Sequence, residues 1–316
     1  MIRMSAGSAA ICGLKRLTID VFPTTAYLLY GQKCQYNCSF CSQAQNSDAS
    51  ENMLSRITWP QFQISELEQA LKAGEEKGLK RVCLQTVKND DIDYKELLKE
   101  ISNVTSLPVC FSGNVNTAED VSILLENGAD KVGISLDVCD PQIFKKVKGG
   151  SFNSRLELII SSAQKFPNRV STHIIIGLGE SEYQVVDVLS KLTPLSIYIG
   201  LFAFTPVKGT QLESFSPPSI TNYRMIQASL YLIESQIIDF DMIFFDQDGN
   251  INSLGLTEKE ISYHLQDGKA FQTRGCPDCN RPYYNEKPGG TMYNYPRTLT
   301  ASETQQAINT VLERIL

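Results

Sequence analysis

Histidine is scarce in this chain of 316 residues, which contains only His173 and His264. A mechanism built on histidine acid–base catalysis therefore has little material. No run of about 18 apolar residues occurs, so we expect no membrane-spanning helix. Basic residues are also too few for a broad nucleic-acid-binding face, because 29 Lys and Arg stand against 35 Asp and Glu, a formal net charge of −6.

A secretion signal is also missing, since residues 1–14 lack the long apolar core that such a signal needs. The nine cysteines are therefore expected to be reduced thiols available for metal binding, and not disulfides. We expect a cytoplasmic protein without a nucleic-acid or membrane partner.

Strand-like apolar runs alternate with stretches of helical periodicity, which predicts repeated βα units around a parallel sheet. The predicted strands are 26–30, 81–87, 108–112, 131–136, 170–177, 196–204 and 241–245. The predicted helices are 64–77, 94–104, 118–127, 156–165, 183–192, 223–236 and 302–316, the last with Ser302 as its N-cap. The pattern indicates an α/β fold of the (β/α) TIM barrel type, either full or partial.

The barrel is predicted to have extensions at both ends. We assign residues 1–25 to an N-terminal extension, 26–268 to the barrel, and 269–316 to a C-terminal segment. From Cys276 to Pro296 the C-terminal segment is rich in Pro, Gly, Tyr and Asn. This composition predicts an ordered, irregular loop ahead of the closing helix.

Three cysteines, Cys34, Cys38 and Cys41, follow the first predicted strand at C-x3-C-x2-C spacing. Active sites of α/β barrels lie at the carboxyl ends of the strands. Three thiolates can hold three irons of a 4Fe–4S cube and leave the fourth open to a substrate. The alternative is a structural zinc site, but such a site is closed by four ligands, and the nearest further Cys or His is Cys12.

This motif, with the aromatic Phe40 before its last cysteine, resembles the signature of radical S-adenosylmethionine (SAM) enzymes. In that family the amino and carboxylate groups of SAM chelate the open iron. One electron from the cluster then splits SAM into methionine and a 5′-deoxyadenosyl radical. The resemblance implies a 4Fe–4S cluster, SAM as a cofactor and an electron donor such as ferredoxin or flavodoxin.

The segment from His173 to Glu180 resembles the G-x-I-x-G-x-x-E element that packs against the adenine of SAM. Ile175, Gly177 and Glu180 match, and His173 stands in place of the first glycine. By itself the segment is also compatible with an ordinary strand-to-helix turn that needs glycine. Val207 lies in a segment, 206–212, that closely resembles the biotin synthase subgroup and whose backbone should flank the adenine.

Ser135 and Asp137, at the end of the fourth predicted strand, resemble the ribose contacts of biotin-synthase-like members. Asp137 could instead cap the helix that follows Pro141. Arg155 resembles the arginine that pairs with the SAM carboxylate, although a surface arginine is the simpler interpretation.

Cys83 and Cys110 fall where biotin synthase carries two of the three cysteines that, with an arginine, hold a 2Fe–2S cluster inside the barrel. The third place is Ser171, and the segment that should bring the arginine, 241–246, has none. We therefore expect Cys83 and Cys110, together with Cys139, to be buried thiols that pack as small apolar residues.

Cys276 and Cys279 form a C-x2-C pair on the C-terminal loop, which predicts an auxiliary metal site with zinc as an alternative occupant. We predict Cys12 as its third ligand and Thr298 as its fourth. The arrangement is similar to lipoyl synthase, whose auxiliary 4Fe–4S cluster is held by three cysteines and a serine and is consumed as the sulfur source. The C-x4-C-x5-C run of single-chain lipoyl synthase is absent here, so the chain is most similar to one component of a two-component lipoyl synthase.

That resemblance implies a radical SAM sulfurtransferase that inserts sulfur at C6 or C8 of an octanoyl chain held on a carrier protein, such as the glycine-cleavage H protein. It implies no catalytic residue beyond the cluster and the SAM radical. The carrier, a sister lipoyl synthase component and ferredoxin are the expected partners. The open alternatives are another biotin-synthase-like enzyme (biotin synthase, a mutase or a cluster maturase) and a non-catalytic, zinc-stabilised binding protein.

Overall fold

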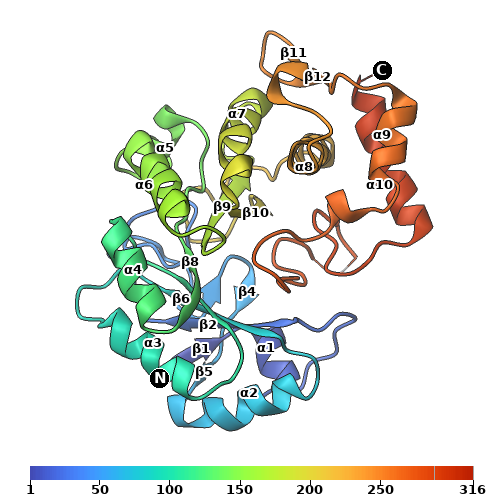
Figure 1. The fold of residues 1–316 in the computed structure, drawn as a ribbon. Helices are drawn as coiled ribbons and strands as arrows, with labels where there is room; N and C mark the ends of the chain where they lie inside the picture. Colours follow the sequence, from blue (N-terminus) through green and yellow to red (C-terminus); the bar gives the residue numbers. More distant parts are fainter. Residues whose placement is uncertain (288, 316) are drawn as a thin grey trace.

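The computed structural model describes residues 1–287 and 289–315 and is built around one eight-stranded sheet (Figure 1). The strands follow the order β10-β9-β8-β7-β6-β2-β1-β5. Two antiparallel strands, β1 (Ile2–Met4) and β5 (Gln61–Phe62), lie beyond β2. The other six are parallel neighbours in chain order: β2 (Thr25–Tyr30), β6 (Arg81–Thr86), β7 (Val109–Ser112), β8 (Ala129–Gly133), β9 (Val170–Ile176) and β10 (Tyr198–Ala203).

Helices follow each parallel strand and lie along the outside of the sheet (Figure 1). They are α2 (Leu67–Glu75), α3 (Tyr94–Asn103), α4 (Ala118–Glu126), α5 (Pro141–Val147), α6 (Phe152–Lys165), α7 (Glu182–Leu192) and α8 (Ile220–Glu234). The other elements are α1 (Ala6–Ile11), α9 (Glu258–Leu265), α10 (Ala301–Ile315), the 3-10 turns η1 (Ile64–Glu66), η2 (Thr193–Leu195), η3 (Phe240–Met242) and η4 (Lys269–Phe271), and the short strands β3 (Met53–Leu54), β4 (Ile57–Thr58), β11 (Phe244–Phe245) and β12 (Ile251–Ser253). None of the described helices is long and apolar enough to span a bilayer.

Successive side chains of each strand point to opposite faces of the sheet. Leu28 of β2 and Leu84 of β6 are fully buried in the large core between the sheet and its helices. Their neighbours Tyr27 and Cys83 lie on the other face, where they line a cavity. Because Phe202 of β10 lines the same cavity, the six parallel strands curve around it as a partial barrel.

The predicted α/β fold is confirmed, and of the two barrels considered the structure has the partial one. The first six predicted strands occur with small shifts at their ends, and each is followed by a helix as predicted. The irregular loop expected after residue 268 is also present, since turns and bends connect η4 to α10.

Two predicted elements differ from the structure, and one predicted region has an added role. The segment 241–245 forms η3 and β11, and β11 pairs with β12 outside the barrel sheet. Helix α10 is capped by Thr300 and not by Ser302, because the Thr300 hydroxyl accepts the Glu303 N–H at 3.2 Å; the predicted last residue of this helix, Leu316, lies outside the described residues. The predicted N-terminal extension, 1–25, contributes β1 to the barrel sheet.

The C-terminal loop reaches from β10 back to the beginning of β2. We call residues 273–286 the seam segment. The Asn285 amide donates to the Ala203 carbonyl at 2.8 Å and the Arg281 guanidinium to the Leu201 carbonyl at 3.4 Å, both on β10. On the other side Asn280 accepts the Thr24 N–H at 2.9 Å. The seam segment therefore occupies the gap in the partial barrel and covers polar groups of its last strand, which an open edge would leave unpaired.

Asn280 is the side chain that fixes the seam segment to the N-terminal side of the gap, and this predicts a measurable cost for its removal. Besides the Thr24 N–H, it bonds the carbonyls of Phe22 at 3.0 Å and Pro296 at 3.3 Å. Asn280→Ala should lower the free energy of unfolding by about 1–3 kcal/mol, because it leaves polar groups without partners. Urea unfolding measures this change, and limited proteolysis should show faster cleavage within 273–286.

Asn309→Ala is the matched control, since Asn309 lies on the exposed face of α10 and bonds only Gln305 there. Equal stability and equal cleavage rates for the two variants would show that Asn280 does not hold the seam segment.

Candidate functional site

The three cysteines of the C-x3-C-x2-C motif lie together on the loop that follows β2. We call residues 34–41 the cluster loop. The Cys34 sulfur accepts two backbone N–H groups, from Tyr36 at 3.4 Å and from Lys88 at 3.3 Å. Such bonds stabilise a thiolate, because they favour its charged form. The Cys34 sulfur is thus held in place by the backbone on both sides of it, and its role as a cluster ligand stays a prediction.

Burial is the main influence on the pKa values of the other two thiols of the cluster loop. It raises the pKa of Cys38 to about 12 and that of Cys41 to about 11. The charges of Cys34 and Cys41 raise the pKa of Cys38 further. The charge of Cys34 raises the pKa of Cys41, while the backbone N–H groups of Gln43 and Ala44 lower it. Three adjacent, partly buried thiolates need cationic compensation, which iron supplies on binding.

The number of ligands distinguishes an iron–sulfur cube from a structural zinc ion at this loop. A structural zinc site is closed by four ligands, whereas the cluster loop provides three cysteines. In a cube three thiolates bind three irons and leave the fourth open. The residues present therefore fit a 4Fe–4S cluster better than the zinc site considered from the sequence.

The turn after β10 supports the cluster loop from one side. The Gly209 carbonyl accepts the Asp48 N–H at 2.8 Å and the Ser47 hydroxyl at 3.1 Å. Gly209 has a positive φ of 86°, and a Cβ on it would lie 2.5 Å from the Ala49 nitrogen. Only glycine allows the two loops to approach this closely.

The segment that resembles the adenine-binding element forms a strand-to-helix turn between β9 and α7. Gly177 has a φ of 103°, and a Cβ on it would lie 2.9 Å from the Pro218 side chain. One Glu180 oxygen accepts the Gly177 N–H at 2.9 Å, and its other oxygen is buried without a described partner. Burial raises the pKa of Glu180. The glycine and the glutamate therefore shape this turn, and the contact of the segment with SAM stays a prediction.

Ser135 and Asp137, the predicted ribose contacts, share one cation. The Lys148 ammonium donates to the Asp137 carboxylate at 2.6 Å and to the Ser135 hydroxyl at 3.1 Å, and all three groups are largely buried. The alternative role of Asp137 as a helix cap is not found, because Asp140 caps α5. The structure thus brings the two predicted contacts together at the carboxyl end of β8.

The remaining predicted SAM contacts lie in three places. Arg155 donates to the Val115 carbonyl at 2.6 Å and lines a pocket of about 400 Å³ together with Cys38 and Lys148. Phe40 lines the central cavity of the barrel, which has a volume of about 210 Å³. Val207 is buried, and its carbonyl accepts the Thr210 hydroxyl at 2.7 Å. The other predicted contacts that line the central cavity are Asp137 and Ile175.

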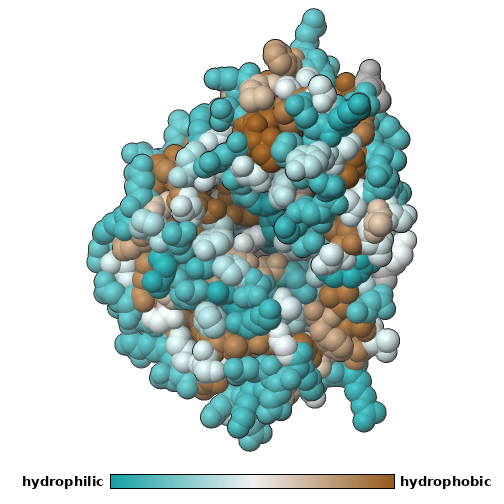
Figure 2. All heavy atoms as spheres, turned by 45° about the vertical axis from the view of Figure 1, so that its right-hand side comes forward, coloured by the Kyte–Doolittle hydropathy of each residue, from teal (hydrophilic) through white to brown (hydrophobic). Residues whose placement is uncertain are grey.

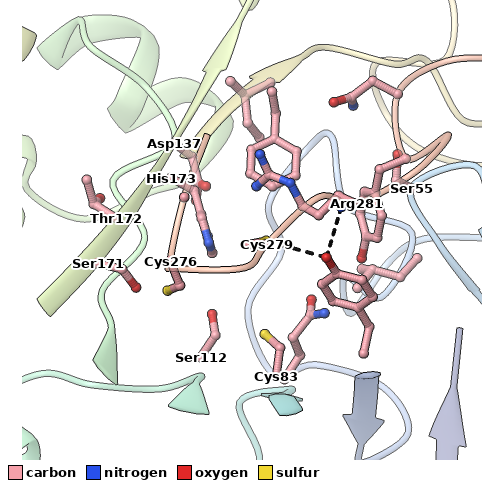
Figure 3. Close-up of a pocket in the computed structure, with 18 of the residues that line it drawn as sticks. Ser55, Cys83, Ser112, Asp137, Ser171, Thr172, His173, Cys276, Cys279 and Arg281 are labelled. Carbon is pink, nitrogen blue, oxygen red and sulfur yellow. Dashed lines mark hydrogen bonds between the residues drawn. The ribbon is translucent and has the colours of Figure 1, made fainter. Parts of the chain in front are cut away.

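The predicted auxiliary ligands are not all brought together. Cys276 and Cys279 of the seam segment line the central cavity (Figure 3). Cys12 is buried on the opposite, helix-covered side of the sheet, where its sulfur packs near Gly74 of α2. Thr298 is exposed next to the Arg297–Glu303 pair at the beginning of α10. The predicted grouping of Cys12 and Thr298 with the other two is therefore not found.

Two cysteines that we expected to be inert packing residues lie beside Cys276 and Cys279 instead. Cys83 of β6 and Cys110 of β7 are paired in register and line the central cavity. A usable signal was present in the sequence. Cys83 is two residues after the start of its strand and shares the inward parity of Tyr27, so the strand alternation alone places it on the inner face.

The cavity between the cluster loop and these thiols contains one histidine and one arginine. Burial lowers the pKa of His173 to about 4, so its ring is neutral at pH 7. The Arg281 guanidinium lies 3.9 Å from the centre of the Phe202 ring. The sequence interpretation gave no role to Arg281, since it precedes a proline in an irregular loop and has no periodic context.

Comparisons with known proteins define the family of this chain. The sequence profile of the radical SAM superfamily matches residues 28–192, just over half of the chain. The chain belongs to the radical SAM superfamily. Among curated proteins it is 28% identical over 186 residues to a biotin synthase of Persephonella marina, covering 57% of this chain and 54% of that protein. It is 29% identical over 215 residues to a biotin synthase of Prochlorococcus marinus, covering 65% and 62%.

The relatives are distant, and the chain spans less than two thirds of the length of these curated proteins. Among solved structures, a methylornithine synthase superposes with a TM-score of 0.52 at 17% identity over 67% of this chain and 62% of that one. The hydrogenase maturase HydG superposes with a TM-score of 0.54 at 15% identity, over 72% and 52%. These likenesses confirm the fold.

The close contact at Gly209 predicts a specific sensitivity of the cluster loop. Gly209→Ala should destabilise the protein by about 1–3 kcal/mol, because the new Cβ overlaps the backbone of residues 48–49, in addition to about 1 kcal/mol for placing Ala at positive φ. Gly149→Ala is the control, since Gly149 also has a positive φ but its Cβ would meet no atom within 4 Å. Thermal unfolding and iron content after anaerobic reconstitution check both variants, and equal losses would contradict the role of Gly209.

The Lys148–Asp137 pair predicts strong coupling between two substitutions. Lys148→Met should cost about 3–5 kcal/mol, because it leaves the buried Asp137 carboxylate without its cation. In an Asp137→Asn background the same Lys148→Met substitution should cost much less. A double-mutant cycle by urea unfolding of the iron-free protein measures this difference, and additive effects would show that the two side chains are not coupled.

Proposed function

We propose that this radical SAM enzyme inserts sulfur into an unactivated C–H bond of a substrate held in the central cavity. The observation that supports the proposal is the cavity itself, which joins Cys41 and Phe40 of the cluster loop to the thiols of Cys83, Cys276 and Cys279 (Figure 3). C–S bond formation requires that the radical source and the sulfur source face the same enclosed space. The cluster loop and the second group of thiols have this arrangement. The biotin synthase relatives point to the same reaction type.

The chain's own residues provide position and exclusion of water. Phe111, Phe202 and Phe204 are among the apolar residues that line the cavity, and an apolar site suits a hydrocarbon chain. Cys41 brings the cluster loop to one end of this space, and the seam segment covers the gap through which water would enter the barrel. Because burial lowers the pKa of His173 to about 4, its ring is a weak base at pH 7 and is poorly suited to general-base catalysis.

When bound, the 4Fe–4S cluster of Cys34, Cys38 and Cys41 supplies one electron for cleavage of SAM, as the resemblance implies. An external one-electron donor of the ferredoxin or flavodoxin class replaces that electron. A second cluster, when bound, would supply the sulfur that replaces the hydrogen of the substrate C–H bond and would accept the electron released as the C–S bond forms.

The substrate class we favour is an octanoyl chain on the lysine of a carrier protein such as the glycine-cleavage H protein, which would make this chain one component of a two-component lipoyl synthase. The resemblance of the segment Cys-Pro-Asp-Cys-Asn-Arg-Pro (276–282) to that group supports this choice, and a sister component is then the second partner. The second candidate is a biotin synthase or another biotin-synthase-like enzyme, which the names of the curated relatives favour. Ser171 in place of a third strand cysteine weighs against biotin synthase itself.

The proposed reaction is tested with iron-loaded protein, SAM and dithionite under anaerobic conditions. We expect 5′-deoxyadenosine to form, and we expect Cys34→Ala, Cys38→Ala or Cys41→Ala to abolish it because three thiolates are needed to leave one iron open for SAM. Mass spectrometry of an added octanoyl-lysine peptide should show the mass of an inserted sulfur.

Two controls separate the candidates. Cys139→Ala removes a buried thiol outside the central cavity and should leave 5′-deoxyadenosine formation intact. A biotin precursor offered in place of the octanoyl peptide tests the second candidate. Sulfur in the biotin precursor alone would replace the lipoyl proposal, and absence of 5′-deoxyadenosine from iron-loaded protein would contradict the proposed function altogether.

A further inference from the structure

Four thiols face one another inside the barrel from two parts of the chain that are far apart in sequence. Cys83 and Cys110 are register partners on the adjacent parallel strands β6 and β7. Cys276 and Cys279 are joined by a tight turn in which the Cys279 N–H donates to the Cys276 carbonyl at 3.1 Å. In Figure 3 the sulfur atoms of Cys83, Cys276 and Cys279 face a common space.

The register of the sheet explains how the two pairs oppose each other. Tyr27, Cys83 and Cys110 form one row across β2, β6 and β7, because Tyr27 pairs with Cys83 and Cys83 pairs with Cys110. The Cys279 sulfur lies 3.4 Å from the Tyr27 hydroxyl at one end of this row. Cys276 lies beside Cys110 at the other end, and both line the central cavity. The two thiols of the turn therefore stand over a row that contains both strand thiols.

The turn that carries Cys276 and Cys279 is held at several points. The Asp278 carbonyl accepts the hydroxyls of Thr24 at 2.5 Å and Thr25 at 3.0 Å. The Pro277 carbonyl accepts the Arg81 Nε–H at 3.0 Å. Because these bonds join the turn to the beginnings of β2 and β6, they fix the position of its thiols relative to the strand thiols.

Two buried cations lie beside Cys110 in this group of thiols. Arg81 donates to the Cys110 sulfur at 3.3 Å and also pairs with Asp130, while Lys131 lies in register with Cys110 and is almost fully buried. Buried cations next to thiols stabilise the thiolate form, which is the form that binds metals.

We propose that Cys83, Cys110, Cys276 and Cys279 together bind a 4Fe–4S cluster, so that this cluster is shared between the barrel strands and the seam segment. The four thiols come from β6, β7 and the seam segment, and a cube accommodates them because each of its irons takes one thiolate. A four-cysteine zinc site is the other occupant that the experiment below distinguishes. The inference deepens the proposed function by giving its second cluster a complete set of ligands. In this set Cys83 and Cys110 replace the predicted ligands Cys12, which lies on the helix-covered side of the sheet, and Thr298, which lies at the beginning of α10.

A shared cluster also links the closing of the barrel to metal binding. Without it the seam segment is held by hydrogen bonds, the Lys80–Asp278 ion pair and the packing of Tyr284. With it two of its cysteines are also tied to β6 and β7. Cluster loading should therefore protect the segment 273–286 from proteases.

The experiment isolates this site by working in a Cys34→Ala/Cys38→Ala/Cys41→Ala background, which lacks the first cluster. After anaerobic reconstitution the full-length wild-type chain should contain about eight irons and the triple variant about four, as expected for two four-iron cubes and one. Adding Cys83→Ala/Cys110→Ala to the triple variant should remove the remaining iron and restore protease cleavage within 273–286. Adding Cys12→Ala should leave both the iron and the protection unchanged.

A second measurement covers the case in which a variant with several substitutions fails to fold. The single variants Cys83→Ser and Cys110→Ser keep the size of the side chain and replace one sulfur ligand with oxygen. Each should retain the cluster with altered Mössbauer and EPR spectra, whereas Cys12→Ser should leave the spectra unchanged. Circular dichroism confirms that each chain is folded.

The outcomes separate this site from the proposed function. Loss of the second cluster in the Cys83/Cys110 variants supports the site even if no substrate is ever thiolated. Retention of the cluster with unchanged spectra in these variants, its loss in Cys12→Ala, or one zinc ion in place of four irons would overturn the site, even if sulfur insertion were observed.

Discussion

The structure depends on the hydrogen bonds that pair the backbone carbonyls at the open edge of β10. Six parallel strands curve far enough to enclose a cavity but do not close, so the last strand presents backbone carbonyls without a neighbouring strand. Arg281 and Asn285 of the seam segment donate to the carbonyls of Leu201 and Ala203, and a polar backbone covered in this way does not pair with other chains. The same contacts bring the C-terminal cysteines into the barrel, so the repair of a sheet edge also determines where two thiols lie.

This arrangement also affects the pKa values of the thiols inside the barrel. An apolar barrel interior penalises isolated thiolates, as the raised pKa values of Cys83 and Cys279 show. Arg81, at the beginning of β6, offsets part of that penalty for both thiols. The face shown in Figure 2 is mostly hydrophilic, with its apolar residues in separate patches.

Local pattern was sufficient to predict most of the fold from the sequence. The parallel strands are short apolar runs, and the cluster loop follows one of them, so its place at the carboxyl end of β2 was predictable. The glycines of the segment 173–180 predicted a strand-to-helix turn at Gly177, and the structure shows a glycine-dependent turn there. The contact between Cys276 and Cys110 could not be predicted, because it spans more than half of the chain and rests on an irregular loop without periodicity. Cys12 was misassigned for a related reason, since its burial depends on the packing of α1 against α2.

X-ray diffraction of the anaerobically reconstituted protein at the iron absorption edge tests the central claim most directly. The account predicts two anomalous peaks in the full-length chain. One should lie within the cluster loop beside Cys34, Cys38 and Cys41, and the other inside the barrel between β6, β7 and the seam segment. A second peak beside Cys12, a single peak at the cluster loop, or a cluster loop closed by a fourth side chain would contradict it.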